Sequence, residues 1–179
     1  ERNEGAVPVL RIPNVALERI DLTDLKFAHL SKGGHERLLL AHGDILVVRT
    51  NGSRDLIGRC AVVEELPEPM AFASYMIRLQ LDHKVILPIY AQRMLQHLRV
   101  SGRLIDFART TAGQYNVSLG RLRSAEIPVP PLPDQRTIVG EIDSLQAKIG
   151  ALKAFQSDSA DKLAALLPSI LDKAFKGQL

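Results

Sequence analysis

The first 130 residues carry short apolar runs separated by turn residues, a pattern typical of β-strands. The clearest run is Ile45–Val48, four consecutive aliphatic residues of buried-strand type. Residues 57–63 are the predicted return strand, because Asn51-Gly52 between the two runs is a dipeptide that favours a tight hairpin turn. Residues 7–12 and 71–81 predict two further strands.

Helical spacing begins at Pro88, a residue that is tolerated in the first turn of a helix. Apolar residues recur every three or four positions from there to Val100, so we predict a helix over 88–100. A second short helix is predicted over 104–107 and a polar loop over 110–114. Ser118 is a good capping residue for a helical turn that follows it.

The longest periodic segment follows residues 127–133, which four prolines hold extended. We predict a helix over 134–176, with a kink or restart at Pro168 and an end at Gly177. Apolar residues spaced alternately by four and three form one seam, whose register passes through the polar Gln156 and Ser159. The seam consists of Ile138, Ile142, Leu145, Ile149, Leu152, Leu163, Leu166 and Ile170.

These patterns predict an α+β fold, in which a mixed globular domain over 1–130 precedes a long helix of coiled-coil type within 131–179. The chain has 179 residues, of which 46% are hydrophobic and 4% aromatic, so the core is expected to be aliphatic. The single cysteine, Cys60, excludes a disulfide scaffold and a cysteine-rich zinc site, and favours a cytoplasmic location. Apolar runs fall short of the roughly 18 residues that a membrane helix needs, so no membrane partner is expected.

Motifs for catalysis are missing from the sequence. It contains no glycine-rich phosphate loop, no dinucleotide fingerprint and no nucleophile elbow, and its five histidines lack paired metal-ligand spacing. Asp82-His83-Lys84 has the spacing of some nuclease sites, but we interpret it as a charged loop before Pro88. The sequence therefore predicts no catalytic residue, no metal site and no cofactor.

The net charge of only +3 conceals a basic stretch over 93–123, which contains six arginines and only one acidic residue, Asp106. A second basic segment, 49–54, surrounds the predicted hairpin tip. Arginine binds phosphate or reads guanine, and amide side chains read adenine or position a loop. One alternative is that both segments are simply a solvated surface. Another is that Gln114 and Asn116 are turn residues whose side chains cap the backbone. The candidate DNA contacts are Arg49, Asn51, Ser53, Arg54, Arg109, Thr111, Gln114 and Asn116.

Several motifs in a fixed order resemble the specificity subunit of type I restriction-modification enzymes. They are Asn116-Val117-Ser118, the Ile-Pro-Val-Pro-Pro-Leu run at 127–132 that leads into a helix, and the closing segment 166–179. Residues 10–15 and 43–49 are similar to recurrent pieces of the family's target recognition domain. The family has two such domains, each followed by a conserved helix, so one domain and one helix look like half of such a subunit.

This resemblance implies a target recognition domain over 1–130 and a helical spacer and dimerisation region over 131–179. It implies sequence-specific recognition of a bipartite site in double-stranded DNA, without chemistry by this chain. The expected partners are methyltransferase subunits and, through them, the restriction subunit. The seam predicts an antiparallel homodimer, which would bury it symmetrically. The alternatives are a fragment of a DNA methyltransferase or nuclease with a fused specificity domain, and a coiled-coil scaffold that does not bind DNA.

Overall fold

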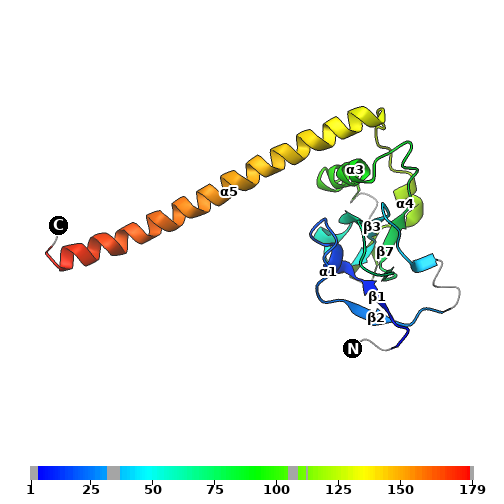
Figure 1. Ribbon diagram of the computed structural model, residues 1–179, viewed down its shortest axis with the longest axis horizontal. Helices are drawn as coiled ribbons and strands as arrows, with labels where there is room; N and C mark the ends of the chain where they lie inside the picture. The colour runs from blue at the N-terminus through cyan, green and yellow to red at the C-terminus, as the bar shows by residue number, and fades with distance from the viewer. Residues whose placement is uncertain (1–3, 32–36, 105–108, 112, 178–179) are drawn as a thin grey trace. The chain divides into compact units, whose positions relative to one another are not determined.

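The computed structural model describes residues 4–31, 37–104, 109–111 and 113–177. The chain divides into two units, Glu1–Arg136 and Thr137–Leu179. The first unit contains the sheets and the helices α1 (Ile12–Val15), α3 (Pro88–Val100) and α4 (Leu119–Arg123), together with the start of α5 (Leu132–Phe175). The second unit consists of the rest of α5 and the residues after it (Figure 1). The chain therefore has the predicted α+β class.

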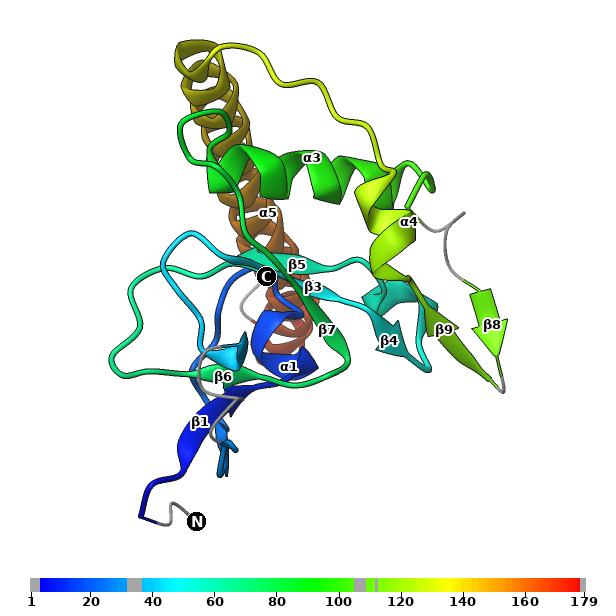
Figure 2. The ribbon, with the colours of Figure 1, turned by 90° about the vertical axis from the view of Figure 1, so that its right-hand side faces the viewer.

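The described part of the first unit contains three sheets of three strands each (Figure 2). One sheet has the order β2 (Lys26–Ala28), β1 (Val7–Leu10), β6 (Ala71–Phe72). The next has the order β5 (Cys60–Val62), β3 (Ile45–Val48), β7 (Met76–Leu79), all antiparallel. The last has the order β4 (Thr50–Asn51), β9 (Gln114–Asn116), β8 (Arg109–Thr111).

The core lies around β3, whose four residues are all buried. β3 is the middle strand of its sheet, and α3 packs against the neighbouring strand β5, so an uninterrupted aliphatic run is needed there. The core is aliphatic, as predicted, and one cluster within it consists of Leu10, Val15, Leu46, Val48, Ala61, Val63, Met70 and Met76. The fully buried Tyr90 on α3 donates its hydroxyl hydrogen bond to the carbonyl of Pro128 at 3.0 Å.

The predicted pairing of β3 with the 57–63 segment is confirmed, but the tight turn at Asn51-Gly52 is wrong. β4 and a 3-10 helix, Arg54–Leu56, lie in the connection, and Gly52 does not adopt a positive φ. Gly58 does, at +75°, where an added Cβ would lie 2.4 Å from a methyl group of Leu104. The chain therefore needs glycine at position 58, after the 3-10 helix, where the backbone approaches the Leu104 side chain closely.

Two further predictions are corrected. The strand predicted over 71–81 is two strands in different sheets, because Ala73 N–H donates to Leu10 while the carbonyl of Tyr75 accepts from Arg49 and Thr50. The polar loop predicted over 110–114 is instead the hairpin of β8 and β9, with Gly113 at a φ of +79°. Most of the short helix predicted over 104–107 lies outside the described residues, and Leu104 itself is in a turn.

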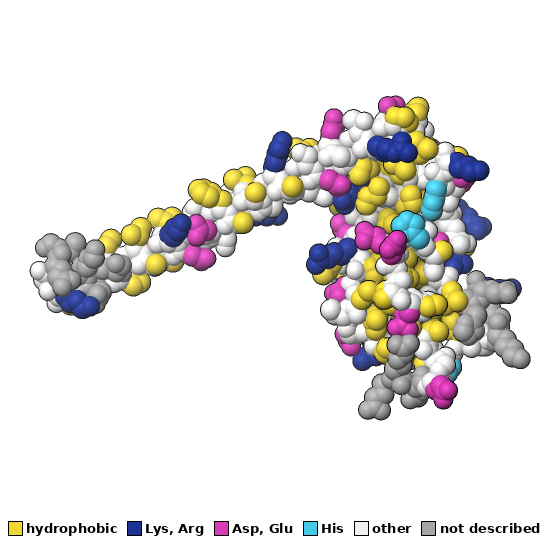
Figure 3. All heavy atoms as spheres, viewed as in Figure 1, with side chains coloured by type: hydrophobic (Ala, Val, Ile, Leu, Met, Phe, Trp, Pro, Cys, Tyr) yellow, Lys and Arg dark blue, Asp and Glu magenta, His cyan; other side chains and the backbone are white. Residues whose placement is uncertain are grey.

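The long helix is confirmed and begins slightly earlier than predicted. α5 runs without interruption through Pro168, so the helix does not restart there, and Gly177 follows its end with a φ of +64°. Figure 3 shows hydrophobic side chains in a row along α5. The exposed members of the predicted seam are Leu145, Ile149, Leu152, Leu163, Leu166 and Ile170, while Ile138 and Ile142 are half-buried. Among the described helices, none has the length and apolarity required to cross a bilayer.

Candidate nucleic-acid interface

The pairing of β4 with β9 brings together the two segments that the sequence predicts as DNA contacts (Figure 2). Thr50 lies opposite Asn116 and Asn51 lies opposite Tyr115. On the other side of β9, Arg109 of β8 is opposite Asn116 and Thr111 is opposite Gln114. The backbones of six of the eight predicted contact positions therefore belong to one small sheet or to the residue directly before it.

The Asn116 side chain is a hydrogen-bond centre within this sheet. Its carbonyl oxygen Oδ1 accepts from Thr50 Oγ1 at 3.0 Å and from Arg49 Nε at 3.3 Å. The backbone adds a third link, because Val117 N–H donates to the Arg49 carbonyl at 2.9 Å. Both Arg49 and Asn116 are half-buried, so this amide fixes the arginine and the start of β4 rather than extending freely into solvent.

Ser53 and Arg54, at the tip that follows β4, are more exposed than Arg49 and Asn116. Asn51 Oδ1 accepts from Ser53 N–H at 2.7 Å, a local turn that leaves the side chains of Ser53 and Arg54 exposed. Gln114 at the start of β9 is also exposed. These three side chains are available to a ligand, and their hydrogen-bonding groups suit phosphate oxygens or base edges.

A groove of about 400 Å³ lies beside this tip. It is lined by residues from four separate parts of the chain: Arg11, Ile12, Pro13, Thr50, Asn51, Gly52, Tyr75 and Gln114. Arg11 and Tyr75 are not among the contacts predicted from the sequence. Arg11 lies in the 10–15 motif, so the sequence offered a signal for it. For Tyr75 it offered none, because in a chain with few aromatic residues a tyrosine is expected in the core and nothing in its neighbours indicates exposure.

Arg11 is held at the edge of the groove by an acidic partner. Its Nη2 donates to both the backbone carbonyl and the Oδ2 of Asp24, each at 2.8 Å. The Arg11 guanidinium, followed by Lys26 at 3.4 Å, holds the pKa of the Asp24 carboxyl below its ordinary value. The charge of Arg11 is therefore largely balanced within the protein.

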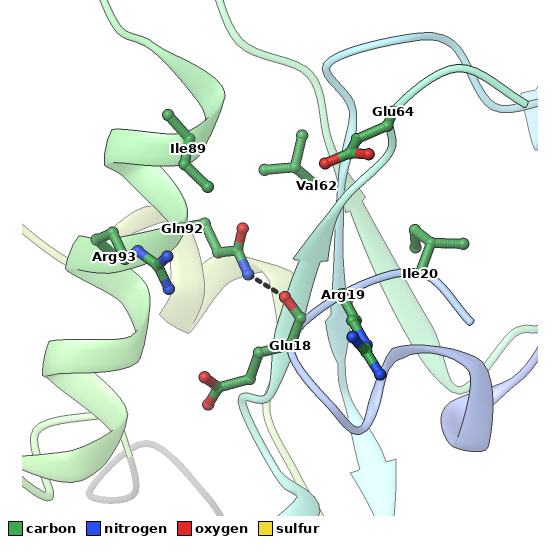
Figure 4. A pocket seen from close by; sticks show the side chains of 8 residues that line it. All are labelled: Glu18, Arg19, Ile20, Val62, Glu64, Ile89, Gln92 and Arg93. Atoms are coloured by element: carbon green, nitrogen blue, oxygen red, sulfur yellow. Dashed lines mark hydrogen bonds between the residues drawn. The ribbon is translucent and has the colours of Figure 1, made fainter. Parts of the chain in front are cut away.

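A second cavity, of about 440 Å³, lies between α3, β5 and the segment after α1 (Figure 4). Its buried Gln92 donates through Nε2 to the carbonyls of Glu18 at 2.6 Å and Cys60 at 3.1 Å. Glu18 also forms an ion pair with Arg99 at 3.3 Å. These contacts tie α3 to two other segments, so we assign Gln92 a structural role.

Among the residues that the structure describes, no three His, Cys, Asp or Glu side chains are grouped in a way that could hold a metal ion. Cys60 is fully buried against α3, and burial, with a smaller contribution from the charge of Glu18, raises the pKa of its thiol to about 12. The thiol is therefore protonated at neutral pH and behaves as a small apolar side chain.

Residues 1–156 match the family of type I restriction modification DNA specificity domains. The chain belongs to this family. It is 29% identical to the type I restriction enzyme EcoKI specificity subunit of Escherichia coli K12, over 99% of this chain and 39% of that protein. It is 27% identical to the StySPI specificity subunit of Salmonella potsdam, over 99% of this chain and 38% of that protein.

Solved structures of this family share the fold. A chain from a type I restriction-modification system superposes with a TM-score of 0.71 at 21% identity, over 99% of this chain and 40% of that one. The HsdS subunit from Thermoanaerobacter tengcongensis gives a TM-score of 0.64 at 20% identity, over 100% of this chain and 40% of that one. The resemblance inferred from the sequence motifs is confirmed, and the chain spans about two fifths of the length of these relatives.

Proposed function

We propose that this chain is a DNA-recognition part of a type I specificity subunit, binding one half of a bipartite target in double-stranded DNA. It performs no catalytic step and directs methyltransferase subunits, and through them the restriction subunit, to that target in the cytoplasm. The observation that carries this proposal is the β4–β9 pairing, which places two polar segments distant in sequence on one surface. Family membership supports the recognition role over a methyltransferase or nuclease fragment and over a scaffold that does not bind DNA.

The predicted contact residues take different roles under this proposal. Arg54 and Ser53 are exposed donors at the tip and bind phosphate. The side chain of Arg109 lies outside the described residues, so its phosphate contact stays a prediction from the sequence. Gln114 and Asn51 present amides to base edges. The side chain of Thr111 lies outside the described residues, so its contact with DNA stays a prediction from the sequence. Asn116 accepts the 3.3 Å hydrogen bond from Arg49 and so holds the arginine side chain in position to contact the DNA.

The two units take different tasks. The target recognition domain corresponds to residues 1–130, and the region over 131–179 is the spacer that assembles subunits. The exposed apolar residues of α5 support an antiparallel homodimer, because each copy would cover the seam of the other. The residues Gln156 and Ser159 then lie near the two-fold axis and fix the register of the pair.

Binding of the full chain to a random library of duplex DNA, repeated at several salt concentrations, tests this function. We expect a recoverable sequence motif and an affinity that falls about tenfold or more for each few-fold rise in salt, because several phosphates are neutralised. Arg54→Gln should reduce the salt dependence by about one phosphate contact. Lys148→Gln on α5 is the matched control and should leave it unchanged. Affinity that does not vary with salt, or no selected motif, would contradict the proposal.

A further inference from the structure

We propose that Tyr75 is a specificity-determining residue, whose ring contacts the thymine of an A·T base pair in the major groove. This inference rests on the proposed function and adds to it a contact from outside the β4–β9–β8 sheet. Tyr75 lies between β6 and β7 and lines the 400 Å³ groove together with Thr50, Asn51 and Gln114. Two of the DNA contacts predicted from the sequence, Asn51 and Gln114, therefore share one groove with Tyr75.

The backbone of Tyr75 is held where the three sheets meet. Its carbonyl oxygen accepts from Arg49 N–H at 2.9 Å and from Thr50 N–H at 3.3 Å, at the entry to β4. Two residues earlier, Ala73 N–H donates to the Leu10 carbonyl at 3.0 Å, and Met76 N–H donates back to Ala73 at 3.0 Å. The ring therefore extends from a fixed point on the same backbone network that positions β4, as a specificity contact requires.

Tyr75 is an exposed tyrosine on the globular unit. It is 41% exposed, whereas Tyr90 is 2% exposed and uses its hydroxyl inside the protein. A tyrosine ring presents a large apolar face at a low cost in conformational entropy, since it has only two rotatable side-chain bonds. An exposed ring on a fixed backbone, beside the exposed amide of Gln114, is thus well suited to contact a ligand.

The chemistry of the groove favours a base edge over a phosphate. Among the described residues that line it, Arg11 is the charged one, and Asp24 balances that charge at 2.8 Å. The other polar groups are neutral: the amides of Asn51 and Gln114, the hydroxyl of Thr50 and the phenol of Tyr75. In the major groove an amide pairs bidentately with adenine N6 and N7, and an apolar group packs on the thymine methyl. Gln114 can therefore pair with the adenine of an A·T pair, while Tyr75 packs on the methyl group of its thymine.

The test selects DNA motifs from a random duplex library with the full chain and with its Tyr75→Ser and Tyr75→Phe variants. We expect Tyr75→Ser to lose discrimination at one A·T position while the other positions of the motif persist. Tyr75→Phe should retain that position, since the ring carries the contact. Leu17→Ser, which changes an exposed apolar residue that does not line the groove, is the control and should leave the motif unchanged.

A second measurement replaces the thymine at that position with uracil, which removes only the methyl group. The unaltered chain should lose about fourfold in affinity, the value expected for one buried methyl group, and Tyr75→Ser should not respond. An unchanged motif in Tyr75→Ser, or equal weakening on all sequences, would overturn the role of Tyr75 alone. Failure of the unaltered chain to select any motif would overturn the proposed function, and this inference with it.

Discussion

The backbone N–H of Leu87 donates to the side-chain oxygen Oε1 of Gln135 at 2.8 Å, which links the start of α3 to the first turn of α5. The Nε2 of the same amide donates to the carbonyls of Val85 at 2.9 Å and Pro130 at 2.7 Å. Gln135 is 0% exposed, so one buried side chain satisfies three backbone groups. The globular unit therefore includes the beginning of the long helix, and its boundary falls after Arg136.

Replacing Gln135 with alanine should lower the free energy of unfolding of the globular unit by about 2–4 kcal/mol, because three buried backbone groups lose their partner. Urea unfolding followed by near-ultraviolet circular dichroism measures this loss. Gln146→Ala, at an exposed position farther along α5, is the control and should change stability by less than about 0.5 kcal/mol. Equal effects of the two substitutions would show that the amide contacts contribute nothing.

Thr50→Val and Asn116→Ala should each weaken DNA binding and each cost about 1 kcal/mol of stability, since both remove the 3.0 Å hydrogen bond between β4 and β9. The double variant should be little worse than the more damaging single change, because the shared bond is lost only once. Affinity and urea unfolding measured on all four proteins complete the cycle. Strictly additive losses would indicate that the two side chains act independently.

Gly58→Ala should destabilise the protein by about 2–4 kcal/mol, as it combines a positive φ with a methyl group placed 2.4 Å from Leu104. Gly52→Ala is the matched control, because no atom lies within 4 Å of the added Cβ and its φ is not positive. Thermal unfolding should leave Gly52→Ala near the parent or slightly above it. If Gly52→Ala were instead the less stable of the two variants, the result would favour the tight turn predicted at Asn51-Gly52.

Cys60 should resist alkylation by iodoacetamide at pH 8 in the folded protein and react readily in urea, since the buried thiol has a pKa of about 12. The folded-state pKa lies above the ordinary value of 9.0, so the thiol does not affect stability below pH 9. Above pH 9 the unfolded chain loses the proton first, and stability falls as the pH rises. Mass spectrometry of the alkylated protein provides the measurement, and rapid labelling without denaturant would contradict the burial.

Ile142→Asp should convert a dimer of the chain into a monomer, because it places a charge in the seam of α5. Light scattering at micromolar concentrations reports the mass. Ser144→Asp introduces the same charge at an exposed position outside the seam and should leave the dimer intact. A parent protein that is already monomeric, with a mass and stability that Ile142→Asp does not alter, would end the proposal of a homodimer.

The sequence by itself determined the features that depend on neighbours along the chain. The seam predicted α5, the continuous run at Ile45–Val48 predicted the buried β3, and the scarcity of aromatic residues predicted an aliphatic core. These patterns are local, because a residue in a helix faces the same side as those three or four positions away. The ordered motifs from residue 116 onward also indicated the family, which the match over residues 1–156 confirms.

Only the tertiary structure decided which strands pair and which polar residues meet. The division of 71–81 into β6 and β7, the pairing of β4 with β9 and the exposure of Tyr75 all follow from partners distant in sequence. A two-residue strand such as β4 has almost no periodicity of its own. It forms because residues 66 positions apart, Thr50 and Asn116, satisfy each other's hydrogen bonds once the core has brought them together.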